Sequence, residues 1–292
     1  MAAAPETPRY SGRLLIGCPD RPGIVAGVSS FLFEQGANIV SSHQYSSDPS
    51  GGRFFLRTEF FLPEPVERER FQTSFAATLA SRFGMDWEIR WWGERPRLAI
   101  MVSRHDHCLQ DLLWRWQRGE LLVDIPCVIS NHDKLRGAVE AFGIPFHHVP
   151  QDTAAQREQA EARMLELIGD SADFLVLARY MRILGPAFVA RYPNRIINIH
   201  HSFLPAFVGA DPYRQAYERG VKIIGATAHY VTTELDQGPI ISQDTAHVSH
   251  SDEIDDLRRL GRDLERQVLA RAVRWHVEDR IIVDGNKTIV FD

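Results

Sequence analysis

The first ninety residues alternate between two hydrophobic periods, one typical of strands and one typical of helices. Residues 12–18 form a short apolar run, which the turn-rich segment 19–23 ends. Apolar side chains then recur at helical spacing over 24–35, and Gly36 is suited to end that helix. The remaining elements are predicted as strands at 38–46 and 54–62, a helix at 67–83 and a strand at 85–92. This β-α-β-β-α-β order predicts a ferredoxin-like domain over residues 10–93.

In the strand predicted at 54–62, one face carries Phe55, Arg57 and Glu59, and the other carries Phe54, Leu56 and Phe60. Charged side chains thus occur on the first of these faces only. We therefore expect one face of this strand to meet solvent.

From residue 97 the pattern changes to short apolar strands that alternate with helices. The polar segment 93–96 separates the two patterns and predicts a domain boundary. Strands are predicted at 98–102, 124–130, 145–149, 174–178, 225–231 and 240–244, with one ending at Ile199, and helices at 107–119, 134–142 and 153–168. This alternation predicts a Rossmann-like α/β domain with a mostly parallel sheet over residues 97–292. Ligands of such sheets bind beyond the carboxyl ends of the strands, so we looked there for functional side chains.

The composition narrows the class of protein. The net charge of −5 over 292 residues argues against a nucleic-acid partner, since such proteins usually carry a basic excess. The three cysteines, Cys18, Cys108 and Cys127, form no CxxC pair and favour a reducing compartment. No signal peptide and no apolar run long enough to span a bilayer is apparent, so we expect a cytoplasmic protein without a membrane partner.

The strand that ends at Ile199 carries the first polar side chains suited to catalysis. Asn198 and His200 are two positions apart, so an extended strand directs both side chains to one face. An amide and an imidazole placed there can polarise a carbonyl group and stabilise its oxyanion. Both residues could equally serve as turn and capping residues ahead of Pro205, and spacing alone does not decide between these roles.

The second polar group lies at 232–239, between two predicted strands. Asp236 stands just before Gly238 and Pro239, and a carboxylate presented by such a loop can act as a general acid or base. Asp and Gly-Pro are also ordinary turn residues, and on its own this segment is more simply interpreted as a plain turn.

Histidines gather at three places: His105 with His107, the pair 147–148 and the pair 200–201. None of them has HExxH or paired-cysteine spacing. Adjacent histidines on a strand point to opposite faces, so each pair offers at most one ligand. We therefore predict no catalytic metal. The sequence also lacks a GxSxG nucleophile elbow and the glycine-rich nucleotide loops, and Cys108 is expected to be a packed thiol.

At this point the second half of the chain resembles the folate-dependent formyltransferases. The resemblance is carried by Asn198-Ile-His200 with Ser202-Phe-Leu-Pro205, followed by Leu235-Asp236-Gln-Gly238-Pro239. It covers residues 97–280 and implies that Asn198, His200 and Asp236 are catalytic. The Tyr-Met-Arg-Ile-Leu segment at 180–184 resembles the one that lines the family's pterin pocket, and 128–131 resembles its second strand end. The folate-binding residues implied are Met181, Arg182, Ile183, Leu184, Thr232, Leu235 and Gly238.

The first half is similar to an ACT domain. The matching residues are Cys-Pro-Asp-Arg-Pro-Gly-Ile-Val at 18–25 and Gly-Ala-Asn-Ile at 36–39. ACT domains generally bind small amino acids, or pair through their sheets, in multimeric enzymes. The resemblance therefore implies a small amino acid as effector and a homo-oligomer. The residues implied for the effector site are Asp20, Gly23, Ile24 and Asn38.

An ACT domain joined to this second domain is the arrangement of the formyltetrahydrofolate deformylases, which the chain resembles as a whole. This implies hydrolysis of 10-formyltetrahydrofolate to formate and tetrahydrofolate, which supplies formate for purine synthesis and balances the one-carbon folate pools. The folate is the substrate, and neither cofactor nor metal is expected. Asp211 departs from the basic or amide residue that is commoner in deformylases, which leaves the role of its loop open.

A folate-dependent formyltransferase acting on an amine is the main alternative. Phosphoribosylglycinamide formyltransferases carry a Gly-Ser-rich loop after their first strand to hold the substrate phosphate. The same place here, 103–109, contains no glycine, and Asp106 would repel a phosphate. His105 and His107 flank this strand end, where they either crowd out an amine or cap a helix. A non-catalytic amino-acid sensor and a metal-dependent hydrolase also remain as alternatives.

Overall fold

The computed structural model describes residues 11–48, 50–205 and 212–292, so Asp211 lies outside the described residues. The chain divides into two compact units between Glu94 and Arg95. This division falls inside the segment 93–96. The predicted ranges 10–93 and 97–292 differ from it in two segments near the C-terminus, because Asp279–Ile282 and Ile289–Asp292 belong to the first unit.

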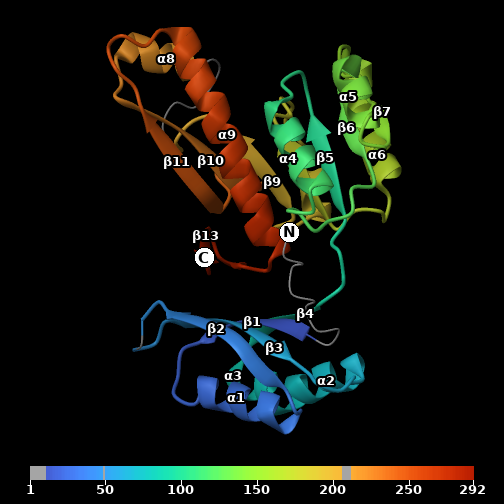
Figure 1. The fold of residues 1–292 in the computed structure, drawn as a ribbon, viewed down its shortest axis with the longest axis vertical. Helices are drawn as coiled ribbons and strands as arrows, with labels where there is room; N and C mark the ends of the chain where they lie inside the picture. The colour runs from blue at the N-terminus through green and yellow to red at the C-terminus, as the bar shows by residue number, and fades with distance from the viewer. Residues whose placement is uncertain (1–10, 49, 206–211) are drawn as a thin grey trace. The chain divides into compact units, whose positions relative to one another are not determined.

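The first unit is a four-stranded antiparallel sheet with helices along one face (Figure 1). Its elements are β1 (Ser11–Pro19), α1 (Ile24–Glu34), β2 (Asn38–Ser46), β3 (Arg53–Phe61), α2 (Arg68–Phe75), the π-helix η1 (Ala76–Ala80), α3 (Ser81–Phe83) and β4 (Asp86–Trp91). The strand order is β2-β3-β1-β4. Phe31 of α1 packs edge-on against Phe71 and Phe75 of α2 in the core. The predicted ferredoxin-like order is confirmed, although a π-turn interrupts the helix expected at 67–83.

Strand β3 is buried on both faces, so the prediction of a solvent-exposed face was wrong. Arg57 is only 3% exposed; its Nε donates to the carbonyl oxygen of Asp279 at 2.8 Å, and its Nη2 donates to Glu59 at 2.7 Å. Asp279 also accepts a hydrogen bond from Arg13 at 3.0 Å. The C-terminal segment thus supplies partners for the polar face of β3. Such a long-range partner cannot be read from the local alternation of residues.

The second unit is built on a seven-stranded sheet with the order β11-β10-β9-β8-β5-β6-β7 (Figure 1). Its elements are β5 (Leu98–Val102), α4 (His107–Gln117), β6 (Val128–Ser130), the 3-10 helix η2 (Asp133–Leu135), α5 (Arg136–Glu140), β7 (Phe146–His148), α6 (Ala154–Ile168), β8 (Phe174–Ala178), α7 (Pro186–Arg191), β9 (Ile196–His200), α8 (Pro212–Arg219), β10 (Ile223–Tyr230), β11 (Ile240–His247) and α9 (Ile254–Val277). A hairpin of β12 (Ile281–Asp284) and β13 (Lys287–Val290) follows. Strands β5 to β9 are parallel, whereas β10 runs antiparallel to β9 and β11. The predicted mostly parallel sheet is confirmed.

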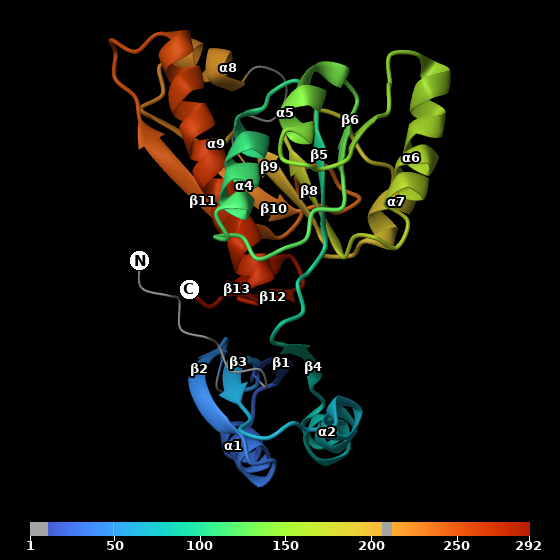
Figure 2. The same cartoon turned by 45° about the vertical axis from the view of Figure 1, so that its right-hand side comes forward.

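Helices cover both faces of this sheet. We name the two faces, and the two sides of the edge where the parallel strands end, after the helices α6 and α9. Ile196 of β9 and Met164 of α6 belong to one hydrophobic core, which identifies the α6 side. Tyr230 of β10 points to the other face, where its hydroxyl lies 2.8 Å from Nδ1 of His276 on α9. Helix α4 lies beside α9 on that α9 side (Figures 1 and 2).

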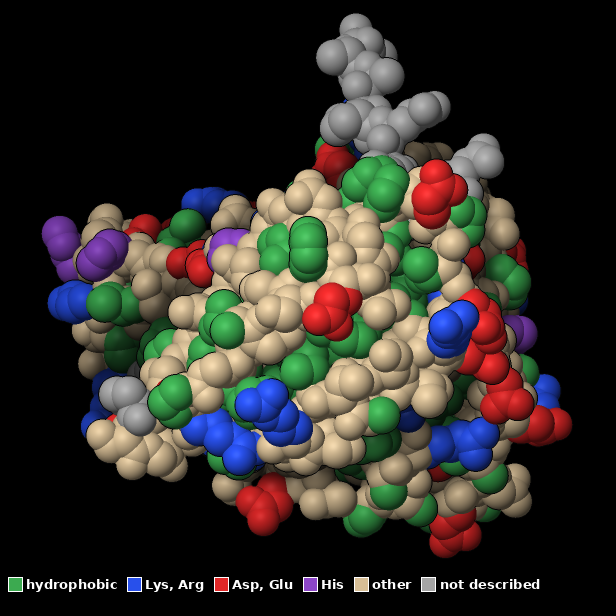
Figure 3. All heavy atoms as spheres, turned by 90° about the horizontal axis from the view of Figure 1, so that it is seen from below, with side chains coloured by type: hydrophobic (Ala, Val, Ile, Leu, Met, Phe, Trp, Pro, Cys, Tyr) green, Lys and Arg blue, Asp and Glu red, His purple; other side chains and the backbone are tan. Residues whose placement is uncertain are grey.

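The surface carries no dominant charge on the face drawn in Figure 3. Acidic and basic side chains form small separate groups there, with hydrophobic side chains between them. This mixed distribution agrees with the modest net charge of −5. Within the three described ranges, no helix combines the length and the apolar character needed to cross a membrane.

Candidate active site

Strand β9 directs two of the three predicted catalytic side chains to the α6 side of the sheet. Ile196 belongs to the core on that side, so Asn198 and His200 point the same way. Asn198 is half-buried and His200 is buried. In the parallel register Asn198 pairs with Leu177 of β8. The amide and the imidazole therefore lie near the carboxyl ends of adjacent strands, as the sequence predicted.

Asp236 reaches the same place from the loop that follows β10. Its backbone φ is +56°, a left-handed conformation that aspartate tolerates better than most residues. Its Oδ2 lies 3.3 Å from Nδ1 of His200. The loop is closed at its base by a hydrogen bond from the backbone N–H of Tyr230 to the carbonyl of Pro239, at 2.9 Å. The structure thus brings Asp236 and His200 together.

His229 on β10 completes this group and was not predicted. Its Nδ1 lies 2.9 Å from the carbonyl oxygen of Tyr230, which can only accept, so Nδ1 carries a proton. Its Nε2 lies 3.2 Å from Nδ2 of Asn198 and 3.7 Å from Oδ1 of Asp236. The antiparallel register makes His229 the direct partner of Asn198. In the sequence His229 lies within an apolar run, so it could have been found only by knowing that β10 pairs with β9.

The two imidazoles control the charge of Asp236. The hydrogen bond with His200, and after it the neighbouring His229, hold the pKa of Asp236 well below its usual range, against the opposing effect of its burial. The carboxylate is therefore ionised at neutral pH and is a weak base. Nε2 of His200, in contrast, is buried and has no hydrogen-bond partner among the described residues. It is the nitrogen of this group that remains available to a substrate.

A cavity of about 350 Å³ lies on the α6 side of the second unit. Residues 180–184 line it together with Gln151 and Met164, among others. The amide nitrogen of Gln151 donates to the hydroxyl of Tyr180 at 2.6 Å, which fixes one wall. The volume is within the range of small-molecule sites, about 300–1,000 Å³.

The predicted folate-binding residues fall into two groups. Met181, Arg182, Ile183 and Leu184 line the cavity. Thr232, Leu235 and Gly238 lie on the Asp236 loop and are not among the residues that line it. The hydroxyl of Thr232 donates to the carbonyl of Glu234 at 3.1 Å, and the side chain of Leu235 is 58% exposed.

Gly238 has a clear packing role in that loop. A Cβ added at this position would lie 1.8 Å from the carbonyl oxygen of Tyr230. Only a residue without a side chain lets the loop pass so close to β10.

Gly238→Ala is therefore expected to destabilise the protein by about 1–3 kcal/mol and to lower turnover, because the loop that carries Asp236 must move. Urea denaturation and an activity assay measure the two effects. Gly137→Ala is the matched control, since a Cβ there meets nothing within 4 Å. Equal stability and turnover in both variants would show that the loop does not depend on Gly238.

The backbone of the cavity wall is anchored by Ser103, at the carboxyl end of β5. Its hydroxyl accepts a hydrogen bond from the N–H of Met181 at 3.0 Å and donates to Oδ1 of Asn131 at 2.7 Å. Ser103 and Asn131 are both buried. The strand ends of β5 and β6 thus fix the start of the segment 181–184.

We expect Ser103→Ala to raise KM for the folate about tenfold with little change in kcat. An unpaired backbone N–H costs about 1–3 kcal/mol, and the position of Met181 would be less well defined. Steady-state kinetics test this against Ser171→Ala, which removes a hydroxyl bonded only to the carbonyl of Ile168. The prediction fails if both variants have the KM of the unsubstituted protein.

The four residues predicted for an effector site have different environments in the first unit. Ile24 is 2% exposed and belongs to the core, so its side chain is unavailable to a ligand. Asp20 accepts a hydrogen bond from the hydroxyl of Ser46. Gly23 precedes α1 with φ +94°, and Asn38 is exposed at the start of β2.

A second buried polar group lies on the α9 side of the second unit. Glu265 of α9, only 1% exposed, accepts a hydrogen bond from Tyr213 at 2.6 Å and bonds Nε2 of His107 at 2.7 Å. Nε of Arg179 lies 3.3 Å from the same carboxylate. We call His107, Arg179, Tyr213 and Glu265 the Glu265 cluster. The sequence singled out only His107, because the other three belong to no recognisable motif.

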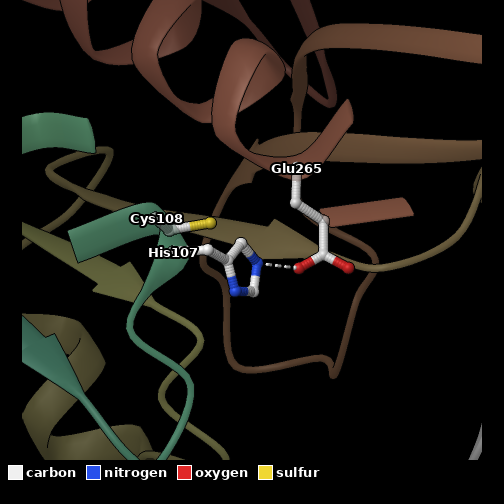
Figure 4. Close-up of side chains that lie close together, drawn as sticks. All are labelled: His107, Cys108 and Glu265. Carbon is white, nitrogen blue, oxygen red and sulfur yellow. Dashed lines mark hydrogen bonds and ion pairs between the residues drawn. The ribbon is translucent and has the colours of Figure 1, made fainter. Parts of the chain in front are cut away.

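Part of this cluster has the spacing of a metal site. One ligand atom each of His107, Cys108 and Glu265 lies within 4.8 Å of the others (Figure 4). Both oxygens of Glu265 already have protein partners, and the Arg179 cation disfavours a second positive charge. Burial also raises the pKa of the Cys108 thiol well above its usual value, which opposes the thiolate that a metal requires. The group fits a buried ion-pair network better than a cation site.

Comparisons with known proteins agree with this architecture. The formyl transferase family model matches residues 96–273, and the ACT domain model matches residues 12–68. A formyltetrahydrofolate deformylase of Bacillus subtilis (strain 168) is 55% identical over 282 residues, which cover 96% of this chain and 94% of the relative. The crystal structure of a formyltetrahydrofolate deformylase from Pseudomonas syringae pv. tomato str. DC3000 has a TM-score of 0.93 at 50% identity, covering 99% of this chain and 96% of that one.

The second unit alone has a wider set of structural relatives. Glycinamide ribonucleotide transformylase 1 from Symbiobacterium toebii has a TM-score of 0.63 at 32% identity, covering 69% of this chain and 97% of its own. The fold and the site thus define a protein with a formyl transferase domain behind an ACT domain. Identity to the deformylases extends over nearly the whole chain. The chain belongs to the formyltetrahydrofolate deformylase family.

Proposed function

We propose that the protein hydrolyses 10-formyltetrahydrofolate to formate and tetrahydrofolate. The observation that carries this proposal is the convergence of Asn198, His200 and Asp236 at the carboxyl edge, in a chain that matches deformylases from end to end. Metabolically, the reaction supplies formate for purine synthesis and balances the one-carbon folate pools.

In this proposal the pterin occupies the cavity lined by residues 181–184. The formyl carbon on N10 lies between Asn198, His200 and Asp236. One N–H of the Asn198 amide is directed to Nε2 of His229, and the second is free to donate to the formyl oxygen. A donor aimed at an oxygen on which negative charge develops stabilises the transition state more than the ground state.

The proton path follows from the low pKa of Asp236 and from the buried Nε2 of His200, which has no hydrogen-bond partner among the described residues. Asp236 is a weak base, so its carboxylate does not take the proton itself but holds the Nδ1 side of His200 and orients the ring. Nε2 of His200 takes a proton from the attacking water, whose oxygen bonds to the formyl carbon. The imidazolium then returns the proton to N10 as the C–N10 bond breaks. Formate and tetrahydrofolate leave, and no group is oxidised or reduced.

Incubation of the purified protein with 10-formyltetrahydrofolate alone tests the proposal. We expect formate and tetrahydrofolate to form in equal amounts, with no amine present. A chelator is expected to leave the rate unchanged, which separates this reaction from that of a metal-dependent hydrolase. Absence of formate, or formyl loss only after an amine is added, contradicts the proposal.

We also propose the cellular compartment, an effector and the oligomeric state of the protein. We place the protein in the cytosol, where its buried cysteines, Cys18, Cys108 and Cys127, stay as the free thiols that the structure contains. A small amino acid acts as effector at the ACT domain, near Asp20, Gly23 and Asn38, and the chain forms a homo-oligomer. Size-exclusion chromatography with light scattering, repeated with single amino acids added, tests both statements.

A further inference from the structure

We propose that the Glu265 cluster decides the acceptor of the formyl group, because it fills the α9 side of the carboxyl edge and leaves room for water but not for an amine. This proposal rests on the proposed hydrolysis. The relatives named for formyl transfer have the same second-unit fold, so the fold itself does not select water. The selection must therefore come from side chains around the reacting carbon.

The cluster is connected to the catalytic histidine by ring contacts. The ring centroid of His201 lies 5.2 Å from that of His200 and 6.2 Å from that of Tyr213. The hydroxyl of Tyr213 then donates to Glu265 at 2.6 Å. His201 directly follows His200, the last residue of β9, and its ring lies close to both His200 and Tyr213, while Glu265 on α9 places the cluster on the α9 side.

The cluster residues come from four different segments of the chain, and the local sequence makes room for two of their side chains. His107 begins α4, and Arg179 directly follows β8. A Cβ at Gly261, one turn before Glu265 on α9, would lie 2.0 Å from the hydroxyl of Tyr213. The glycine thus provides the space that the phenol ring occupies. Arg179 adopts φ +61°, a conformation unusual for any residue but glycine, and its guanidinium is buried.

These features make the α9 side dense and closed. Glu265, Tyr213 and Arg179 are all buried, and the carboxylate is bonded on both oxygens. An amine that approached the formyl carbon from this side would have to displace a buried ion pair, whereas water need not. The cluster residues determine specificity and are not catalytic, because they do not touch the reacting atoms.

The test measures how the formyl group is partitioned between two acceptors. The unsubstituted protein, Arg179→Gly and Tyr213→Ala are each incubated with 10-formyltetrahydrofolate and excess glycinamide, a small primary amine. Glycine suits the φ of +61° at position 179, so the substitution adds no backbone strain there. In a transfer event, the amine nitrogen bonds to the formyl carbon, the C–N10 bond breaks, and the amine proton goes to N10.

We expect the unsubstituted protein to yield formate alone. In both variants N-formylglycinamide should become measurable. Its ratio to formate should be at least about ten times the smallest ratio that the assay can detect. The ratio does not depend on the fraction of active protein, so partial misfolding does not change it. Asn194→Gly, another non-glycine residue in the left-handed region with φ +54°, controls for the backbone change and should keep the unsubstituted ratio. Arg179→Lys keeps the positive charge and should also yield formate alone.

Two results would overturn the inference. One is an unchanged product ratio in both Arg179→Gly and Tyr213→Ala while they still hydrolyse the folate. The other is formylation of glycinamide by the unsubstituted protein. If one variant does not fold, the ratio in the other decides. Failure of the proposed function is distinguishable, because the unsubstituted protein would then produce no formate in the reaction without glycinamide.

Discussion

Asp236→Asn is expected to lower turnover by about 100- to 10,000-fold while folate binding stays measurable. The amide keeps the shape of the carboxylate but not its charge, so no negative charge remains 3.3 Å from Nδ1 of His200 while that ring accepts the proton of water. It also removes the negative charge beside His229. Because the cavity wall at residues 181–184 comes from a different segment, the loss should appear in kcat and not in affinity.

The comparison needs a control and a binding measurement. Asp252→Asn is the matched control, since Asp252 only accepts a hydrogen bond from the backbone N–H of Ser249 in an exposed turn. Single-turnover release of formate gives the chemical rate, and calorimetry with tetrahydrofolate gives the affinity. Unchanged turnover in Asp236→Asn would remove Asp236 from the proton path. A matching loss in Asp252→Asn would point to a general effect on folding.

The sequence could predict Asn198, His200 and Asp236 because each stands in a short local motif. Asn198 and His200 share a strand face by their spacing alone, and Asp236 precedes a Gly-Pro turn between two strands. Their convergence depends on β10 pairing with β9, which their spacing in the chain does not specify. The predicted strand at 225–231 was correct in type, yet its partner had to be known before His229 could be recognised as part of the site.

The residues that the sequence missed have one feature in common, which is a dependence on tertiary contacts. Arg57 looked like a solvent-facing residue of an alternating strand, but the C-terminal segment supplies its partner at Asp279. Glu265 looks like one of many charged residues along α9, and it is buried because that helix packs against α4, α8 and strands β9 to β11. The spacing of apolar residues predicts which face of a helix or strand a side chain lies on. It does not predict which other part of the chain covers that face.

Glu265→Gln should produce the largest loss of stability among the described polar residues that we consider. Its carboxylate compensates the buried guanidinium of Arg179 and accepts hydrogen bonds from His107 and Tyr213. Loss of one member of a buried charge pair costs about 3–5 kcal/mol, because the other charge remains without compensation. Urea denaturation followed by tryptophan fluorescence at pH 7 measures the difference.

The pH dependence of that difference gives an independent check. Burial alone would raise the pKa of Glu265, but the hydrogen bond from His107 and the charge of Arg179 outweigh it and lower the pKa to about 2. A carboxyl group whose pKa is lower in the folded state stabilises the protein above its unfolded pKa, about 4.3. That contribution is lost as the pH falls from there towards 2.

The difference in free energy of unfolding between the unsubstituted protein and Glu265→Gln should therefore be widest at neutral pH. It should narrow below about pH 4.3, where Glu265 becomes protonated in the unfolded chain but not yet in the folded protein. Glu166→Gln is the control, since Glu166 pairs with Arg163 at 2.6 Å on the surface and its side chain is 70% exposed. Such exposed pairs contribute about 0–1 kcal/mol. A loss of similar size in the two variants, or a gap that stays constant down to pH 3, would show that Glu265 does not stabilise the fold through its charge.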